Sequence, residues 1–201
     1  AVGCGSVADE AGSKNTIFFD RGNPYHNVSK GTLDTTGSYR STSVGTGAKA
    51  YEGGTALGMK AQSAALGVAL GAQAKSEDVA AIAVGPAALA KGNTSLAIGR
   101  QSIAEKDFAQ AIGNVSAATG KGSLAMGHSA TATGNRSIAI GSADIDNAGN
   151  TGNQQGTVYQ TQEQTLSTGK DSIAFGAAAK ATKDHTLAIG AHSNAEGVNA
   201  I

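Results

Sequence analysis

The chain has 201 residues, enough for one or two ordinary domains, and its 15 basic and 15 acidic residues give a formal net charge of zero. A neutral chain generates no overall field that would favour nucleic acid or an anionic membrane as its partner. With 29 glycines, only 4 Phe and 4 Tyr, and no Trp, the composition argues against a thick globular core and favours thin, closely stacked layers.

Residues 1–40 are expected to form an N-terminal cap or a separate small segment. They lack the repeated pattern that begins at residue 41, and they contain half of the aromatic residues of the chain. A cap is expected at this place because the end of a solenoid otherwise exposes unpaired strand edges. Cys4 is the single cysteine, which excludes an intrachain disulfide.

From residue 41 onward, a short pattern recurs about every 14 residues. Each copy ends a short apolar run with a glycine, which we call the marked glycine. The steps between successive marked glycines are 13 and 13, then 14 five times, then 35, then 14. The step of 35 equals one repeat plus an insertion of about 21 residues. The marked glycines are Gly45, Gly58, Gly71, Gly85, Gly99, Gly113, Gly127, Gly141, Gly176 and Gly190.

Each copy predicts two short β-strands, because residues alternate in character with a period of two. The first strand ends at the marked glycine, and the second covers about the third to fifth residues after it. The glycine is expected to serve a turn that needs a positive φ or close packing. Two strands and two turns per repeat form one coil of a narrow parallel solenoid, so the predicted fold class is an all-β parallel β-roll.

The first strand of each coil carries apolar side chains on both faces, large aliphatic residues on one and Ala on the other. A strand exposed to water on one face would alternate apolar with polar residues. One face can fill the interior of the roll, and the other then needs a second chain, so we expect an oligomer with the first strands near its axis. The residues assigned to the core of the roll or of the oligomer are Val84, Leu96, Ile98, Ile112, Leu124, Met126, Ile138, Ile140, Ile173, Phe175, Leu187 and Ile189.

The fourth residue after each marked glycine is expected to face solvent, because small inward residues flank it on both sides. In the middle of the chain, Leu89, Ile103 and Ala117 occupy this outward column in successive coils. Contiguous apolar side chains on a surface often mark an interaction site. We therefore predict that this stripe contacts a receptor, with packing on a neighbouring subunit or loop as the alternative.

The insertion is placed at about residues 142–170, a polar stretch rich in Gln, Asn, Thr and Gly. A long loop between regular coils is usually functional or mobile, so Val158 and Tyr159 are candidate receptor contacts. A brace for the oligomer and a merely tolerated loop are the alternatives. Asp144 and Asp146 alternate as calcium ligands do, but the Glu that completes a calcium loop is missing. We predict no metal site and name these two residues only as candidates.

The repeats resemble those of a known family. GNTSLAIGRQSIAEKD at 92–107, KGSLAMGHSATATGNRSIAIG at 121–141 and DSIAFGAAAKATKDHTLAIGAHSNAEG at 171–197 are similar to the head repeats of trimeric autotransporter adhesins, the YadA-like heads of Gram-negative bacteria. The resemblance covers about residues 41–201, apart from the insertion. It implies a left-handed parallel β-roll of 14-residue coils that assembles as a homotrimer. GVNAI at 197–201 begins another repeat, so we expect the chain to be a piece of a longer protein.

The resemblance also implies a function. A stalk and an outer-membrane anchor outside this chain would hold the head on the bacterial surface. There it would bind a host protein such as collagen, laminin, fibronectin or a CEACAM-type receptor, with autoagglutination and biofilm formation as further roles. It implies no catalysis, no cofactor and no nucleic acid.

Other classes remain as alternatives. The chain could be a structural spacer of a surface fibre, with binding elsewhere. A left-handed β-helix acyltransferase is also trimeric, but its coil of about 18 residues does not fit the shorter period of this chain. GTGAKA at 45–50 resembles a nucleotide-binding loop, but no helix follows it and the repeat already explains its glycine.

Overall fold

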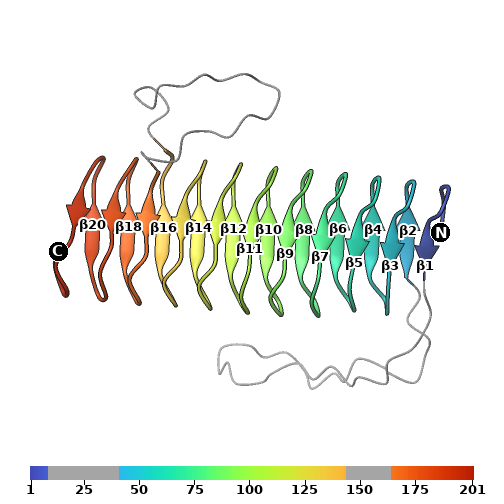
Figure 1. Cartoon of the computed structure of the whole chain (residues 1–201), viewed down its shortest axis with the longest axis horizontal. Coiled ribbons are helices and arrows are strands. Elements are labelled where there is room, and N and C mark those ends of the chain that lie inside the picture. Colours follow the sequence, from blue (N-terminus) through green and yellow to red (C-terminus); the bar gives the residue numbers. More distant parts are fainter. Residues whose placement is uncertain (9–40, 144–163) are drawn as a thin grey trace, which may run out of the picture.

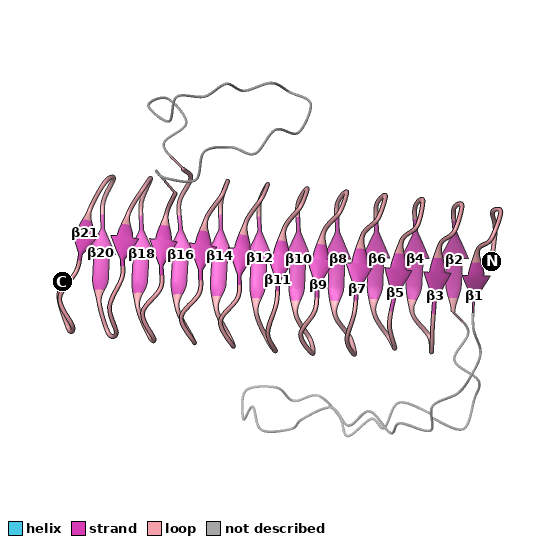
Figure 2. Cartoon of the chain, viewed as in Figure 1, coloured by secondary structure: helices cyan, strands magenta, loops and turns pink. Residues whose placement is uncertain are grey.

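Two parallel sheets face each other along a rod, and the chain passes from one to the other twice in every coil (Figure 1). This architecture comes from a computed structural model, which describes residues 1–8, 41–143 and 164–201. The described residues form strands, turns and loops (Figure 2). Among them, no helix is long and apolar enough to cross a membrane. The predicted solenoid of 14-residue coils is confirmed.

Sheet A contains the first strand of each coil and has ten strands in the described residues. Its strands are β2 (Thr42–Val44), β4 (Thr55–Leu57), β6 (Val68–Leu70), β8 (Ile82–Val84), β10 (Leu96–Ile98), β12 (Gln110–Ile112), β14 (Leu124–Met126), β16 (Ile138–Ile140), β18 (Ile173–Phe175) and β20 (Leu187–Ile189).

Sheet B contains the second strand of each coil and has eleven described strands. Its strands are β1 (Val7–Ala8), β3 (Lys49–Ala50), β5 (Gln62–Ser63), β7 (Lys75–Ser76), β9 (Leu89–Ala90), β11 (Ile103–Ala104), β13 (Ala117–Ala118), β15 (Thr131–Ala132), β17 (Leu166–Ser167), β19 (Lys180–Ala181) and β21 (Asn194–Ala195).

All strand pairs are parallel and in register with the repeat. Leu96, for example, pairs with Ile82 in the preceding coil and with Gln110 in the following one. Residues at equivalent repeat positions therefore form continuous columns along the rod. Where successive repeats carry similar side chains at the same position, these side chains form a continuous stripe along one surface of the molecule.

Small side chains fill the interior of the roll. The middle residue of every sheet A strand is buried, and Ala97 on β10 and Ala104 on β11 are both 0 % exposed. In the described part of the chain, the largest fully buried side chains are Thr165 and Thr186. The sequence left open which face of the first strand fills the roll, and the structure assigns the Ala face to the interior.

Apart from the turns where undescribed segments begin, each described coil contains two tight turns whose third residue has a positive φ. In the first turn, the N–H of Ser102 donates to the carbonyl of Gly99 at 3.3 Å, and Gln101 has a φ of 56°. The hydroxyl of Ser102 donates to the same carbonyl at 3.0 Å, which accounts for a Ser at this place in the repeat. In the second turn, the N–H of Ser95 donates to the carbonyl of Gly92 at 3.1 Å.

The marked glycines have the role expected of them. Gly85 has a φ of +125°, and a Cβ placed on it would lie 2.7 Å from the backbone of Gly99 in the next coil. A side chain is therefore excluded both by backbone conformation and by the close stacking of coils.

Residues 1–8 extend the roll by one coil, so the repeat begins before residue 41, where the sequence placed its start. Val2 forms a bridge with Val44, and Val7 pairs with Lys49. Gly3 has a φ of +124° and occupies the marked position. Ala1, Val2 and Gly3 repeat the Ala–apolar–Gly ending of the other coils, which is the signal that the sequence reading missed. Residues 9–40 lie outside the described part of the chain.

The insertion is shorter than the predicted range 142–170. Thr165 is buried in the interior, and Leu166 on β17 pairs with Thr131 on one side and Lys180 on the other. At the other end of the insertion, the N–H of Ala143 still donates a hydrogen bond to the carbonyl oxygen of His128 in the preceding coil, at 3.0 Å. The inserted residues therefore lie between 143 and 165, and residues 165–170 belong to the roll.

Candidate functional site

Sheet A presents a long apolar face on the outside of the roll. The two residues that flank the buried middle residue of each strand point outward, as Leu96 and Ile98 do on β10. Ile98 is 37 % exposed, Phe175 52 % and Ile189 65 %. With ten rungs spaced by about 4.8 Å, the face is ~43 Å long. Contiguous exposed apolar surface of this length is typical of a protein interface.

All the residues that the sequence assigned to the core of the roll or of the oligomer lie on this outer face. None of them lies in the interior, because they are half-buried or exposed in the single chain. In the described strands, polar side chains interrupt the face only at Thr42, Thr55 and Gln110.

Sheet B carries the predicted stripe of Leu89, Ile103 and Ala117. Ile103 pairs directly with Leu89 on β9 and with Ala117 on β13, so the three side chains stack on adjacent rungs. Ile103 is 37 % exposed, and the column faces outward as predicted. The stripe ends at Thr131 on β15, and Leu166 is the next apolar residue of the outward column.

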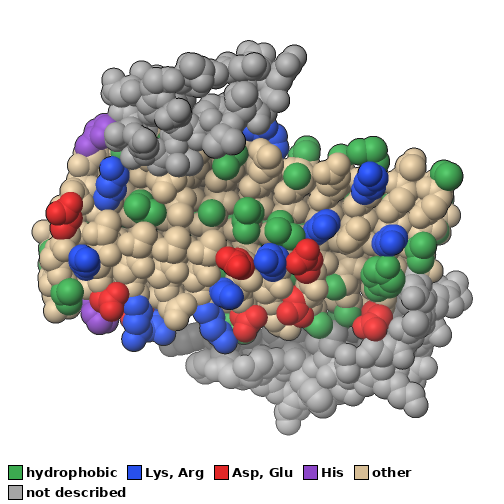
Figure 3. Space-filling model, in the orientation of Figure 1, with side chains coloured by type: hydrophobic (Ala, Val, Ile, Leu, Met, Phe, Trp, Pro, Cys, Tyr) green, Lys and Arg blue, Asp and Glu red, His purple; other side chains and the backbone are tan. Residues whose placement is uncertain are grey.

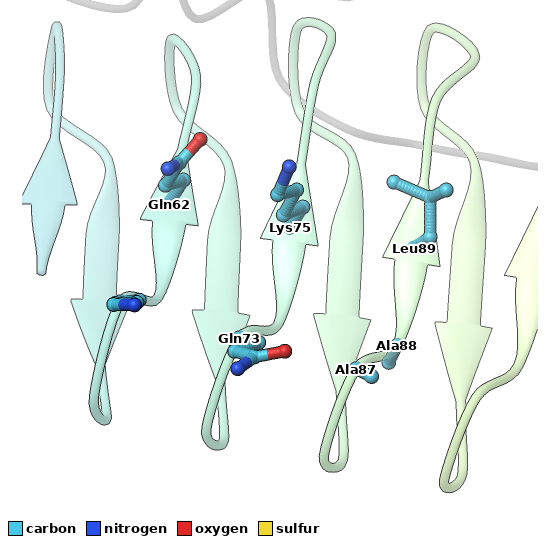
Figure 4. Close-up of a pocket in the computed structure, with 7 residues that line it drawn as sticks. Gln62, Gln73, Lys75, Ala87, Ala88 and Leu89 are labelled. Carbon is cyan, nitrogen blue, oxygen red and sulfur yellow. The ribbon is translucent and has the colours of Figure 1, made fainter.

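A pocket of about 470 Å³ lies beside this stripe, toward the N-terminal end of sheet B. Gln62, Lys75 and Leu89 extend into it from three adjacent strands, while Gln73 and Ala87 come from the neighbouring first turns (Figure 4). Lys60 completes its basic lining. The sequence reading named Leu89 but missed the pocket, whose signal is the group of Lys and Gln residues two and four positions after successive marked glycines.

The second turns form a charged edge in which opposite charges pair between coils. Lys121 lies 3.2 Å from Asp107 and 5.9 Å from the ring centre of Phe108. Hydrogen bonds from Lys121 and from the N–H of Asn93 hold the pKa of Asp107 below its usual value. Such exposed pairs add little to stability individually.

The strongest of these pairs joins Arg136 to Asp171. The guanidinium donates through Nε and through a terminal nitrogen to both carboxylate oxygens, at 2.6 and 2.7 Å. These bonds lower the pKa of Asp171 and raise the pKa of Arg136. The pair links the coil before the insertion to the coil after it.

The first turns carry a short polar ladder. Arg100 Nε donates to Asn114 Oδ1 at 2.9 Å, and the side-chain amide of Asn114 lies 3.4 Å from Nδ1 of His128. No Asp or Glu joins this ladder in the described residues, and they contain no group of side chains suited to hold a metal ion. The geometry is that of contacts between coils.

Four predicted site residues lie outside the described part of the chain. They are the candidate metal ligands Asp144 and Asp146 and the candidate receptor contacts Val158 and Tyr159. Their roles stay predictions.

A comparison with protein families matches the repeats. The family model described as "YadA head domain repeat" matches residues 63–88, 90–116, 118–143, 167–193 and 181–201. The matched segments cover more than half of the chain and lie within the coils described above. No curated protein matches the chain significantly.

Proposed function

Because the chain belongs to the YadA head family, we propose that it is the binding head of a trimeric adhesin on the surface of a Gram-negative bacterium. YadA heads occur in trimeric autotransporter adhesins anchored in the outer membrane, a family of adhesion proteins and not of enzymes. The homotrimer and the binding of host proteins are the parts that we propose for this chain.

The observation that carries the proposal is the apolar outer face of sheet A. In a homotrimer, three such faces pack around one axis and withdraw their aliphatic side chains from water. Full burial of one such side chain contributes about 1.5–3 kcal/mol. The interior of the roll already excludes these residues, so a partner subunit is the arrangement that buries them.

Sheet B then faces away from the axis and remains available to a ligand. The stripe of Leu89, Ile103 and Ala117 is presented three times around the trimer, so contacts that are weak singly gain by avidity. We propose that this stripe contributes to binding of a host protein such as collagen, laminin, fibronectin or a CEACAM-type receptor.

The test combines oligomeric state with binding. Sedimentation equilibrium of the purified chain should give a homotrimer, and surface plasmon resonance should detect binding of that trimer to at least one of these host proteins. The double variant Leu89→Lys with Ile103→Lys should weaken the binding while the trimer stays intact. Leu166→Lys is the matched control, because Leu166 lies in the same outward column but outside the stripe.

Two results would count against the proposal. A trimer that binds none of these proteins and does not agglutinate cells favours a structural spacer. A double variant that binds its receptor as the unmodified chain does removes the stripe from the binding surface.

A further inference from the structure

The described acidic residues are confined to one edge of the roll, whereas the basic residues occur on both edges. Every described acidic residue lies in or directly beside a second turn, at Glu52, Glu77, Asp78, Glu105, Asp107, Asp171, Asp184 and Glu196. The outward column of sheet B and the first turns contain only basic charges among the described residues: Lys49, Lys60, Lys75, Arg100 and Lys180. In Figure 3, most acidic side chains accordingly lie in the lower half of the rod, on the side of the second turns.

Two of these lysines, Lys60 and Lys75, line the pocket, and Lys49 lies one rung beyond Gln62 on the N-terminal side. Lys49 precedes Gln62 in the outward column, and Gln62 precedes Lys75, each one rung apart. Lys60 lines the pocket from the first turn beside them. We call Lys49, Lys60, Gln62, Gln73 and Lys75 the basic groove.

The lysines of the basic groove are not neutralised within the described residues. Lys91, Lys121 and Arg136 of the second turns each form an ion pair, but no described acid lies within ion-pair distance of Lys49, Lys60 or Lys75. Glu77 lies beyond β7 at the opposite end of the strand from the pocket and is not part of its lining. The groove therefore presents positive charge that a negatively charged ligand can neutralise.

The backbone of the groove is held in place by the roll. The N–H of Lys60 donates to Thr46 O and the N–H of Gln73 to Met59 O, both at 2.8 Å. Strand pairing fixes the spacing of the outward column, so Lys49 and Lys75 emerge roughly 10 Å apart. Positive charges are thus spread along the rod axis, and they are not focused on one point as in a site for a single phosphate.

We propose that the basic groove binds a segment of a highly sulfated polysaccharide. Lys49 and Lys75 lie in a line along the rod axis and Lys60 lies beside them, so the positive charges are spread along the rod as the charges of such a chain are. The amides of Gln62 and Gln73 can donate to and accept from sugar hydroxyls, and Ala87 and Leu89 provide an apolar wall for the sugar rings. Among the described residues, no aromatic side chain lines the pocket to stack on a nucleic acid base.

This inference rests on the proposed function in one respect only. The trimer covers sheet A and leaves the basic groove of sheet B exposed in three copies. A polysaccharide chain long enough to reach two grooves would then bind with avidity. The chemistry of a single groove does not depend on the trimer.

Isothermal titration calorimetry with a size-fractionated heparin oligosaccharide tests the proposal. Affinity should fall as salt is raised, because exposed charge interactions are screened. Lys60→Glu with Lys75→Glu should weaken binding roughly tenfold or more, since hydrogen bonds to charged groups are among the stronger ones. Lys183→Glu is the matched control, because Lys183 is an exposed second-turn lysine that lies outside the groove.

Two further measurements separate shaped recognition from charge alone. Gln62→Ala with Gln73→Ala leaves every charge in place and should still reduce the affinity for heparin. Desulfated heparin, polyglutamate and duplex DNA should bind more weakly than heparin to the unmodified chain.

Several results would overturn the inference: a folded chain that does not bind heparin, an equal loss in the Lys183 control, or equal binding of polyglutamate or DNA. Sedimentation of the same sample keeps the two proposals apart. A monomer that binds heparin through the groove supports this inference and refutes the trimer, whereas a trimer that ignores heparin refutes this inference alone.

Discussion

The most direct test of the assembly is a charge placed on the apolar face of sheet A. Ile98 points out of the roll at the middle of this face and is 37 % exposed. Covering that remaining surface contributes about 1 kcal/mol per subunit. In Ile98→Asp this gain is lost, and an unpaired carboxylate enclosed by aliphatic side chains costs several kcal/mol more. The variant appears three times in a trimer, so the total is on the order of 10 kcal/mol, enough to abolish association.

Ile103→Asp is the matched control for this experiment. Ile103 is also 37 % exposed and points outward, but from sheet B. The two variants make the same chemical change at the same exposure on opposite faces of the roll. Sedimentation equilibrium should show loss of the trimer for Ile98→Asp and an intact trimer for Ile103→Asp, with circular dichroism reporting the β-structure of each. A trimer that survives Ile98→Asp, or one that both variants disrupt equally, refutes the assignment of sheet A to the interface.

Three further predictions concern the coil itself. Gly99→Ala should destabilise the roll by ~1–3 kcal/mol more than Gly190→Ala does, as measured by urea unfolding. Both glycines have positive φ, but of the two only Gly99 faces the backbone of a following coil. Equal effects would contradict the role of Gly99 in the close stacking of coils. Val115 has a φ of 57°, a left-handed backbone conformation that strains a β-branched residue and that Asn tolerates. Val115→Asn should therefore raise the free energy of unfolding by ~1 kcal/mol, and an unchanged urea midpoint would show that Val115 is not strained. Because Arg136 lowers the pKa of Asp171, the pair stabilises the fold above the usual carboxyl pKa and loses that effect as pH falls through the lowered value. Arg136→Gln should return the pKa of Asp171 to its usual range in an NMR titration, and a pKa that stays low would exclude the ion pair as its cause.

The coil could be predicted from the sequence because each of its constraints recurs in every copy. A marked glycine such as Gly85 is the only residue that fits both a φ of +125° and the close stacking of coils, so it is kept at each step. The two strands of each coil could be predicted in the same way, because the alternation of side-chain character recurs in every copy. Which face of sheet A turns inward was not predicted, because Ala on one side and Leu or Ile on the other are both compatible with burial. The 0 % exposure of Ala97 shows the physical answer, which is that two sheets this close together have room only for small side chains.

The bounds of the insertion were harder to predict, because a regular repeat does not specify where an inserted segment begins and ends. Counting on from Gly141 placed Asp144 and Asp146 in the two inward positions of the next sheet B strand. Thr165 and Ser167 occupy those positions instead, and both are buried. A carboxylate has no partner in an interior of Ala and Ser, so the chain leaves the roll before Asp144 and returns at a segment whose small residues fit.

The division between a constant interior and variable outward columns explains how one rod can present several surfaces. Because Ala97, Ala104 and their equivalents fill the interior, an outward residue can change from coil to coil without disturbing the packing. The outward column of sheet B uses this freedom, since it is basic near Lys75 and apolar on the three rungs from Leu89 to Ala117. The outer face of sheet A does not vary in this way, because it stays apolar at nearly every rung. This difference is what we expect when one face must fit identical subunits and the other is free to match ligands, which supports our proposal that sheet A serves assembly and sheet B recognition.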